Sequence, residues 1–336
     1  MAEKKSAKET NGKDSTKETK TRTAKTKADS RAKTEPKAKK EPTAKMTAKP
    51  AAKPKQRTKS RAKAKPKMNL KVIALGGLDE IGKNMTVLEY GDDIIIIDCG
   101  LAFPEDDMLG IDLVIPDVTY LTKNIDKIKG IVLTHGHEDH IGAVPYVLKE
   151  LDVPIYTMPL TAALIELKLE EHDLLYNTQI FTKKVGSSFR LGAFTIEFIN
   201  VNHSIPDAVA LAIGTPIGTV IHTGDFKIDV TPIQGSMMDI ARLGQLGNDG
   251  VLALLSDSTN VEKPGYSASE RKVGASFNKL FMGCDKRIII TTFASNVHRL
   301  QQIIDVAAKY GRKVAITGRS MENVLHVASV LGYVKI

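Results

Sequence analysis

One six-residue segment carries four side chains of the kinds that bind metal ions in proteins. Residues 135–140 read His-Gly-His-Glu-Asp-His and follow directly on the apolar run 131–133. Imidazole nitrogen and carboxylate oxygen are ligands of catalytic zinc, with manganese as the alternative. A single ion cannot easily use all four groups, because Asp139 and His140 diverge from His135 and His137. The spacing predicts two neighbouring ions that share further ligands and activate a water molecule between them.

An ordinary structural role is the alternative for these histidines. A lone histidine is more often a packed or exposed side chain than a ligand, and two histidines at positions i and i+2 mean little. However, three of the eight histidines of the chain and an aspartate fall within this one hexapeptide. Packing does not explain such a cluster, and clustered His and Asp point to a metal site.

Further ligands are expected where later strands end. Residues 194–199 alternate like a strand and lead to His203, and the apolar run 219–222 leads to Asp225. We expect His203 to complete the shell of the ion held by His135 and His137, and Asp225 to bridge both ions with its two oxygens. An aspartate beside a glycine usually marks only a turn, so both assignments depend on the histidine cluster that precedes them.

Several segments of the chain resemble a known family of proteins. The histidine cluster, a later histidine and Thr-Gly-Asp at 223–225 are the pattern of the metallo-β-lactamase superfamily. Narrower matches are Gly-Gly-Leu-Asp-Glu-Ile-Gly-Lys-Asn at 76–84, Ile-Asp-Cys-Gly at 97–100, Asn-His-Ser-Ile-Pro at 202–206, Ser-Asp-Ser-Thr-Asn at 256–260 and Phe-Ala-Ser-Asn-Val-His-Arg at 293–299. Together they make residues 69–336 similar to bacterial ribonuclease J, in the β-CASP branch of nucleic-acid hydrolases.

The resemblance implies an α/β fold, an αββα metallo-β-lactamase sandwich with a partial β-CASP domain. We expect a disordered basic tail at 1–67, the metallo-β-lactamase domain at 68–268 and part of β-CASP at 269–336. In the family the first domain resumes after β-CASP with a Ser-Gly-His stretch and one more metal-binding histidine. This chain stops at Ile336, inside what resembles the insert. We therefore expect a fragment of a longer protein, whose second ion lacks one ligand.

The resemblance also implies an activity and partners. It implies hydrolysis of RNA phosphodiester bonds by two divalent ions, most simply Zn²⁺, with both endonuclease and 5′→3′ exonuclease action in mRNA decay and rRNA processing. Asp139, Asp225 and His203 would be the catalytic residues. His135 and His137 would hold one ion with His203, while Asp139 and His140 hold the other. Homodimers or homotetramers, and a complex for RNA degradation, are the implied assemblies.

Two segments are candidates for contact with RNA. We expect Ser295 to cap a helix that runs to Lys309, whose first N–H groups and positive dipole end suit an anion. Main-chain donors of this segment would then hold an RNA phosphate, including a 5′-monophosphate, while Ser258 would line the RNA path. The alternatives are an ordinary helix cap and an ordinary turn. The proposed RNA-binding residues are Ser295, Asn296, Val297, His298, Arg299 and Ser258.

The remaining elements are expected to place these residues at the ends of strands. A strand at 70–75 and a hairpin of 85–90 with 94–97 come first, and the four isoleucines of 94–97 indicate a strand buried on both faces. Asp98, at its end, is expected to fix a ligand imidazole. Helices at 143–151 and 161–175 and strands near 180–184 and 209–213 follow. From 287 on, strands at 287–292 and 313–317 alternate with helices and predict a parallel sheet.

Composition divides the chain into two unlike parts. Residues 1–67 hold 24 Lys and Arg against 7 Asp and Glu, a net charge of +17, so the total of +9 leaves −8 for residues 68–336. The tail lacks aromatic residues and Ile, Leu and Val, which predicts disorder. It is either an electrostatic arm for RNA or a solubilising extension. Basic residues of the acidic body, such as Lys227 and Arg299, could line a positive groove.

The remaining features concern compartment and rival functions. The two cysteines, Cys99 and Cys284, indicate a reducing compartment, and neither a signal peptide nor a membrane span is evident, so we expect a cytoplasmic protein. One rival is a small-molecule metallohydrolase of the thioesterase or lactamase type. The other is a catalytically incomplete RNA-binding fragment.

Overall fold

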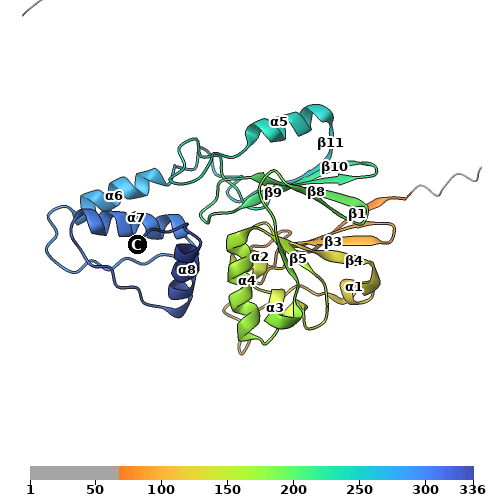
Figure 1. Ribbon diagram of the computed structural model, residues 1–336, viewed down its shortest axis with the longest axis horizontal. Helices are drawn as coiled ribbons and strands as arrows, with labels where there is room; N and C mark the ends of the chain where they lie inside the picture. The colour runs from red at the N-terminus through yellow and green to blue at the C-terminus, as the bar shows by residue number, and fades with distance from the viewer. Residues whose placement is uncertain (1–67) are drawn as a thin grey trace, which may run out of the picture. The chain divides into compact units, whose positions relative to one another are not determined.

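The computed structural model describes residues 68–336. The expected disorder of residues 1–67 lies outside this part of the chain. Two β-sheets form the centre of the described residues, and helices cover their outer faces (Figure 1). This is the predicted α/β sandwich. Within residues 68–336 no helix is long and apolar enough to cross a membrane.

The first sheet has six strands in sequential order, β1-β2-β3-β4-β5-β6. Their bounds are β1 Leu70–Gly76, β2 Met85–Tyr90, β3 Asp93–Ile97, β4 Ile128–Val132, β5 Ile155–Thr157 and β6 Ile180–Thr182. β1 to β3 are antiparallel, and β3 to β6 are parallel. The predicted hairpin is confirmed, with Thr86 opposite Ile97. Because β4 follows β3 in parallel, Asp98 and the histidine cluster leave the same edge of the sheet.

The second sheet has five strands in the order β11-β10-β9-β8-β7. Their bounds are β7 Ser188–Leu191, β8 Phe194–Asn200, β9 Val209–Thr215, β10 Gly218–His222 and β11 Val251–Leu255. Only β10 and β11 run parallel, and the other pairs are antiparallel. The strands predicted before His203 and Asp225 are thus β8 and β10, while β7 was not predicted.

Strand β3 shows how the sandwich is held together. All four isoleucines of 94–97 are fully buried, as predicted. Ile95 and Ile97 belong to the apolar cluster between the sheets, whereas Ile94 and Ile96 belong to the cluster under the helices. Each fully buried isoleucine contributes about 1.5–3 kcal/mol. The strand that precedes Asp98 is therefore fixed from both faces.

Helices cover both outer faces. The first sheet carries α1 Thr119–Thr122, α2 Glu138–Ile141, α3 Val144–Val147 and α4 Pro159–Glu171, and the second carries α5 Ile240–Asp249. Figure 1 shows α3 and α4 on one side of the sheets and α5 on the other. The predicted helices 143–151 and 161–175 correspond to α3, which is much shorter, and to α4.

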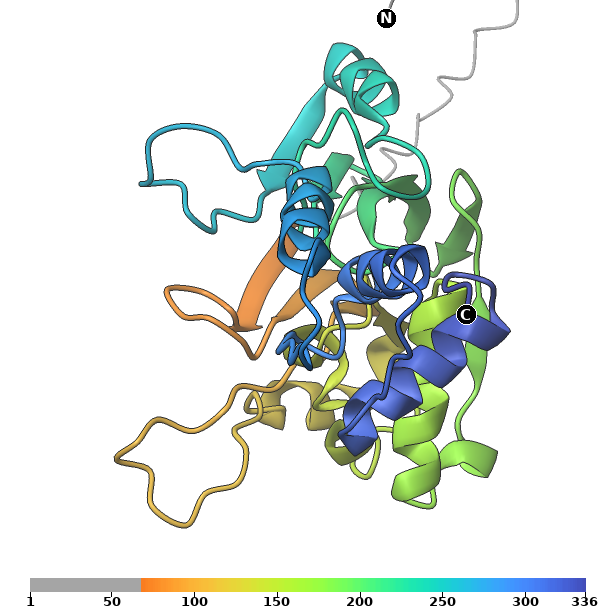
Figure 2. The same ribbon diagram turned by 90° about the vertical axis from the view of Figure 1, so that its left-hand side faces the viewer.

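The last part of the described chain contains α6 Arg271–Phe281, α7 Val297–Lys309 and α8 Arg319–Val330. α6 packs on α7 through Phe277, Phe281 and Ile303, and α8 packs on α4. In Figure 2 these three helices are the blue ones in front of the sheets. Val297 and Ala328 join the same apolar cluster as the first sheet.

Two predictions for this part are wrong. Residues 287–292 and 313–317 form no β-ladder within residues 68–336, so the predicted parallel sheet is not there. Their apolar side chains suit a strand, but a strand also needs a neighbour that takes its main-chain hydrogen bonds. Ser295 does not cap α7 either. Asn296 does, because its side chain accepts a hydrogen bond from the N–H of Arg299.

Candidate metal centre

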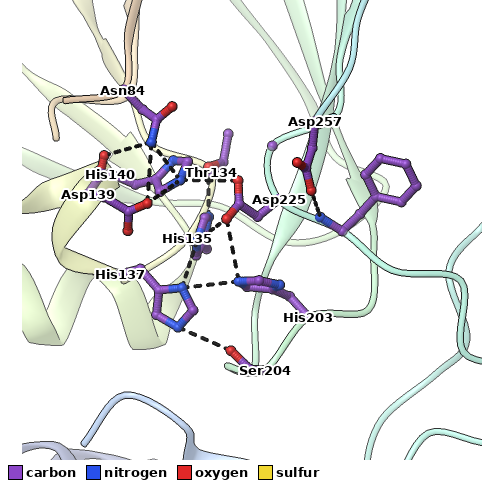
Figure 3. A network of polar contacts seen from close by, with 12 residues as sticks. Asn84, Thr134, His135, His137, Asp139, His140, His203, Ser204, Asp225 and Asp257 are labelled. Carbon is purple, nitrogen blue, oxygen red and sulfur yellow. Dashed lines mark hydrogen bonds and ion pairs between the residues drawn. The ribbon is translucent and has the colours of Figure 1, made fainter. Parts of the chain in front are cut away.

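Three strands deliver the predicted ligands to one place. β4 ends at Val132, three residues before His135, while β8 ends three residues before His203 and β10 ends three residues before Asp225. The short helix α2 then carries Asp139 and His140. Figure 3 shows the side chains from these segments turned toward one another. The structure thus brings together residues that are up to 90 positions apart in the sequence.

The six side chains form two overlapping groups. In each group one ligand atom per residue lies within 4.8 Å of the others. The first group is His135, His137, His203 and Asp225, and the second is Asp139, His140 and Asp225. Asp225 faces both groups, since its Oδ1 lies 3.2 Å from Nε2 of His140 and its Oδ2 lies 3.7 Å from Nε2 of His203. This is the bridging position expected for Asp225.

Asp98 sets the proton positions of two imidazoles. Its Oδ2 accepts a hydrogen bond from the hydroxyl of Thr134 at 2.9 Å. The Thr134 hydroxyl has thereby used its proton, so at its 3.0 Å contact with Nδ1 of His135 the histidine must be the donor. Neutral His135 therefore keeps its proton on Nδ1 and turns the lone pair of Nε2 toward the cluster. Asp98 also accepts directly from Nδ1 of His140 at 2.8 Å.

Burial keeps three of the histidines neutral. Removal from water lowers the pKa of His135 well below its usual value, and the neighbouring histidines lower it further. Burial also lowers the pKa of His137 to about 3 and that of His203 to about 4, although the charge of Asp225 opposes both shifts. Neutral imidazole is the form that ligates metal, so these three side chains are ready to bind at neutral pH.

In the second group the histidine favours the protonated form, unlike the three neutral histidines of the first group. Burial alone would lower the pKa of His140, but the carboxylates of Asp98 and Asp225 raise it well above the usual value. Burial would raise the pKa of Asp225, yet the hydrogen bond and charge of His140 lower it to about 2. Burial raises the pKa of Asp139. The carboxylates therefore surround a position that favours positive charge.

The donor set fits a pair of divalent cations. Nδ1 of His137 lies 3.1 Å from Nε2 of both His135 and His203. One nitrogen cannot donate to two others, so these lone pairs do not satisfy each other. A cation between these nitrogens would accept their lone pairs. Nitrogen and carboxylate donors in these numbers suit Zn²⁺ or Mn²⁺, and the fold and the cluster together indicate a divalent metal site.

The loop after β3 packs closely against the turn of α2 that carries Asp139 and His140. Asn84, Cys99 and Leu101 donate N–H bonds to the carbonyls of Asp139, His140 and Glu138, which fixes the turn of α2. A Cβ on Gly100 would lie 1.6 Å from the carbonyl oxygen of Asp139. Only glycine allows the loop after β3 to approach the ligand turn so closely.

Three polar neighbours of the ligands were not predicted. The Asn84 amide nitrogen lies 3.2 Å from Nε2 of His140 and 3.4 Å from Oδ2 of Asp139. Ser204 Oγ lies 3.3 Å from Nε2 of His137, and Thr134 joins Asp98 to His135. Their side chains are common polar types, so only the fold reveals their position. Glu138 instead pairs with Lys168 at 2.6 Å.

The structure does not leave the predicted phosphate site free. The N–H groups of Asn296 and Val297 donate to the carbonyls of Phe293 and Ser295, so both main-chain donors are engaged within the chain. Arg299 is paired with Glu270 at 2.6 Å. Nδ1 of His298 is buried without a partner among the described residues. Ser258, beyond the end of β11, is exposed.

Comparisons with known proteins agree with this geometry. A family model described as the metallo-beta-lactamase superfamily matches residues 78–235, and one described as "Ribonuclease J, beta-CASP domain" matches residues 285–336. A ribonuclease J of Synechocystis sp. is 52% identical over 268 residues, which cover 79% of this chain and 42% of that protein. The chain belongs to the ribonuclease J family. The predicted resemblance is thus confirmed.

Other members of the ribonuclease J family are similar to this chain to a comparable extent. Ribonuclease J 1 of Streptococcus pyogenes is 49% identical, covering 79% of this chain and 47% of that protein, and ribonuclease J2 of Bacillus subtilis is 44% identical, covering 80% and 48%. The chain spans less than half the length of these relatives. A crystal structure of a protein of unknown function from Enterococcus faecalis has a TM-score of 0.56 at 19% identity, covering 78% of this chain and 68% of that chain, and shows the fold alone.

Proposed function

We propose that this member of the ribonuclease J family is a metal-dependent ribonuclease that hydrolyses RNA phosphodiester bonds. The observation that carries the proposal is the convergence of the two ligand groups on Asp225, with ligand atoms within 4.8 Å in each. The names of its relatives supply the substrate class. When bound, two divalent cations would lower the pKa of water and neutralise charge on the phosphoryl oxygens.

The residues of the chain would share this work in three ways. His135, His137 and His203 would hold one cation, Asp139 and His140 would hold the other, and Asp225 would serve both. Asp98 would orient the imidazoles of both groups, through Thr134 for His135 and directly for His140. Asp139, Asp225 and His203 would be the catalytic residues, since they lie where substrate would meet the cations.

The finer properties are proposed from the family. We propose Zn²⁺ as the native ion with Mn²⁺ as the alternative, both 5′→3′ exonuclease and endonuclease action, and roles in mRNA decay and rRNA processing. A homodimer or homotetramer, an RNA-degradation complex and a cytoplasmic location belong to the same proposal. So do the boundaries at residues 68–268 and 269–336. Residues 295–299 and Ser258 would contact RNA, with Arg299 exchanging Glu270 for phosphate.

Metal counting and cleavage assays test the proposal together. The purified chain is expected to hold two divalent ions by elemental analysis and to cleave a 5′-phosphorylated single-stranded RNA. Asp225→Asn should lower both the metal content and the cleavage rate, because the amide replaces one of the two ligand oxygens by an NH₂ group and removes the negative charge. A matched control is Asp257→Asn, which alters a carboxylate outside both ligand groups.

Two results would contradict the proposal. Cleavage of a thioester without cleavage of RNA, measured side by side, would support a small-molecule hydrolase that uses the same cations. Zero or one ion per chain, with RNA binding but no cleavage, would support a binding fragment.

A further inference from the structure

A row of aromatic rings closes the end of the sandwich where both sheets have their last strand. Tyr156 of β5 stacks on Phe181 of β6 at 5.1 Å and on Phe189 of β7 at 5.2 Å, with ring planes within 18° of parallel. β6 is an edge strand of the first sheet and β7 of the second. The rings of the row therefore come from both sheets, and no further strand of the described chain covers Phe181.

A lysine sits over the whole row. Nζ of Lys183 lies 5.4 Å from the ring centre of Tyr156, 5.7 Å from that of Phe181 and 4.8 Å from that of Phe189. Such distances give a cation–π attraction with each ring. No carboxylate of residues 68–336 lies within 4.0 Å of this Nζ. The charge of Lys183 is thus held in place by rings and stays available to an anion.

The row is accessible, and its strands lie beside the strand that leads to the metal centre. Phe181 is 42% exposed, and Lys184 beside it is exposed. Phe181 pairs with Tyr156, and Tyr156 pairs with Val132, the last residue of β4 before the histidine cluster. Two strand spacings of about 4.8 Å place Phe181 about 10 Å across the sheet from Val132.

We propose that Tyr156, Phe181, Phe189 and Lys183 form a platform that binds single-stranded RNA outside the metal centre. A base extends the ring stack on the open face of Phe181, and Lys183 with Lys184 meets the adjoining phosphates. Stacking of bases on aromatic rings combined with basic side chains is how proteins bind single strands without sequence preference. The platform rests on the proposed ribonuclease function, because it assumes that the strand reaches the nearby metal centre.

Binding of a fluorescent single-stranded RNA of about 12 nucleotides, within the usual range of site sizes, tests the platform without requiring cleavage. Phe181→Ala and Phe181→Leu should weaken binding by about 5- to 150-fold, since a stacked base contributes about 1–3 kcal/mol. Phe181→Tyr keeps a ring and should bind like the unaltered protein. Lys183→Gln should also weaken binding, whereas Lys149→Gln, which removes a lysine 5.7 Å from the ring of Tyr146, should not.

The variants separate stacking from its rivals. The same substitutions should leave hydrolysis of a dinucleotide unchanged, because so short a substrate does not reach Phe181. Unaltered RNA affinity in Phe181→Leu would overturn the platform, and the aromatic rings would then serve only to pack the edge of the sandwich. Equal losses of RNA affinity in Lys183→Gln and Lys149→Gln would overturn it, because any surface lysine would then contribute equally through its charge. Unaltered RNA affinity with a changed oligomeric state would overturn it in favour of a protein contact.

The test also distinguishes failure of the platform from failure of the proposed function. A protein that binds RNA through Phe181 but cleaves no RNA when loaded with metal contradicts the ribonuclease function and supports the platform. The opposite result is also informative. If the unaltered protein cleaves RNA, and the Phe181 variants and Lys183→Gln all bind RNA as tightly as it does, only the platform is contradicted.

Discussion

At the scale of single residues, Asp98 controls which nitrogens of the cluster carry protons. Its Oδ1 accepts from the N–H of Thr134, and its Oδ2 accepts from the Thr134 hydroxyl and from His140. In Asp98→Asn the amide would keep its oxygen on the Thr134 N–H and turn its NH₂ toward the other two groups. In its neutral, metal-binding form His140 would then accept on Nδ1 and carry its proton on Nε2, the atom that faces Asp225.

Asp98→Asn is therefore expected to lower metal affinity and cleavage rate by about 10- to 100-fold, the usual effect of losing an outer partner of a ligand histidine. Competition with a metal-binding dye measures the affinity, and initial rates measure the activity. Asp93→Asn is the matched control, since Asp93 lies at the other end of β3 and instead accepts from Ala193. Equal effects of the two substitutions would contradict the tautomer role.

Gly224 is a second residue whose identity the centre requires. Its φ is 54°, in the left-handed region, and an added Cβ would lie 3.0 Å from both Thr134 Cβ and the carbonyl oxygen of Val209. Gly224→Ala should destabilise the fold by more than the roughly 1–2 kcal/mol of a left-handed backbone and should lower activity by moving Asp225. Gly235→Ala isolates the backbone effect, since Gly235 has φ 75° and open space around it.

Denaturant unfolding and cleavage rates check this pair. Gly235→Ala should lose stability with unchanged activity, whereas Gly224→Ala should lose both. A Gly224→Ala protein that is as active as the unaltered one would show that the strand end tolerates a side chain and that Asp225 is placed by other contacts.

Residue types and spacing predicted which side chains converge, because side chains able to bind metal are chemically distinctive and here follow strand ends. The same reasoning predicted a supporting role for Asp98, which follows a fully buried strand. It could not find Asn84, whose amide reaches the cluster from 55 positions away in the sequence. It also could not show that main-chain donors near Ser295 are already engaged, because hydrogen bonds such as the one from Val297 N–H to the Ser295 carbonyl are invisible without coordinates.

At the scale of elements, the loop that carries His203 is held by the end of the described chain. Asp207 Oδ2 accepts hydrogen bonds from the hydroxyl of Tyr333 at 2.5 Å and from the N–H of Leu160, at the start of α4, at 3.0 Å. Ile205, in the same loop, is 1% exposed and packs in the cluster that contains residues of α7 and α8. The C-terminal helices thereby support a strand end of the metal centre.

Tyr333→Phe should destabilise the protein by about 0.5–1.5 kcal/mol, the usual net contribution of one hydrogen bond, and weaken metal binding a few-fold by loosening the loop. Burial, with help from Asp207, raises the pKa of Tyr333 well above its usual value, so this bond persists through neutral and mildly alkaline pH. Unfolding curves and metal titration measure the two effects. Tyr176→Phe, at a fully exposed ring, is the control, and equal results would contradict the support role.

The elements show where pattern reading succeeds. The alternating or continuously apolar segments of the sandwich became strands because each has a neighbour, as β3 has between β2 and β4. Residues 287–292 have the same apolar character, yet Ile289 is 85% exposed and no ladder forms in residues 68–336. An apolar sequence pattern shows that a segment has side chains suited to a strand. Whether the segment pairs in a sheet depends on distant parts of the chain.

At the scale of the whole molecule, charge is divided between the two parts of the chain. Residues 1–67 carry +17 and residues 68–336 carry −8. The basic side chains proposed to line an RNA groove are partly neutralised within the body, as Arg299 is by Glu270. Long-range attraction of a polyanion must therefore come mainly from the tail.

Removal of residues 2–67 is expected to weaken binding of single-stranded RNA most strongly at low salt. Each phosphate contact that the tail makes adds about −0.7 to the slope of log affinity against log salt, so the slope should become less steep. The cleavage rate at saturating RNA should not change, because both groups of side chains that could hold a cation lie in residues 135–225. Fluorescence titrations at several salt concentrations measure the slope, and hydrolysis of a dinucleotide serves as the control. An unchanged slope would show that the tail is a solubilising extension, and RNA would then have to be drawn in by local groups such as Lys183 despite the net charge of −8.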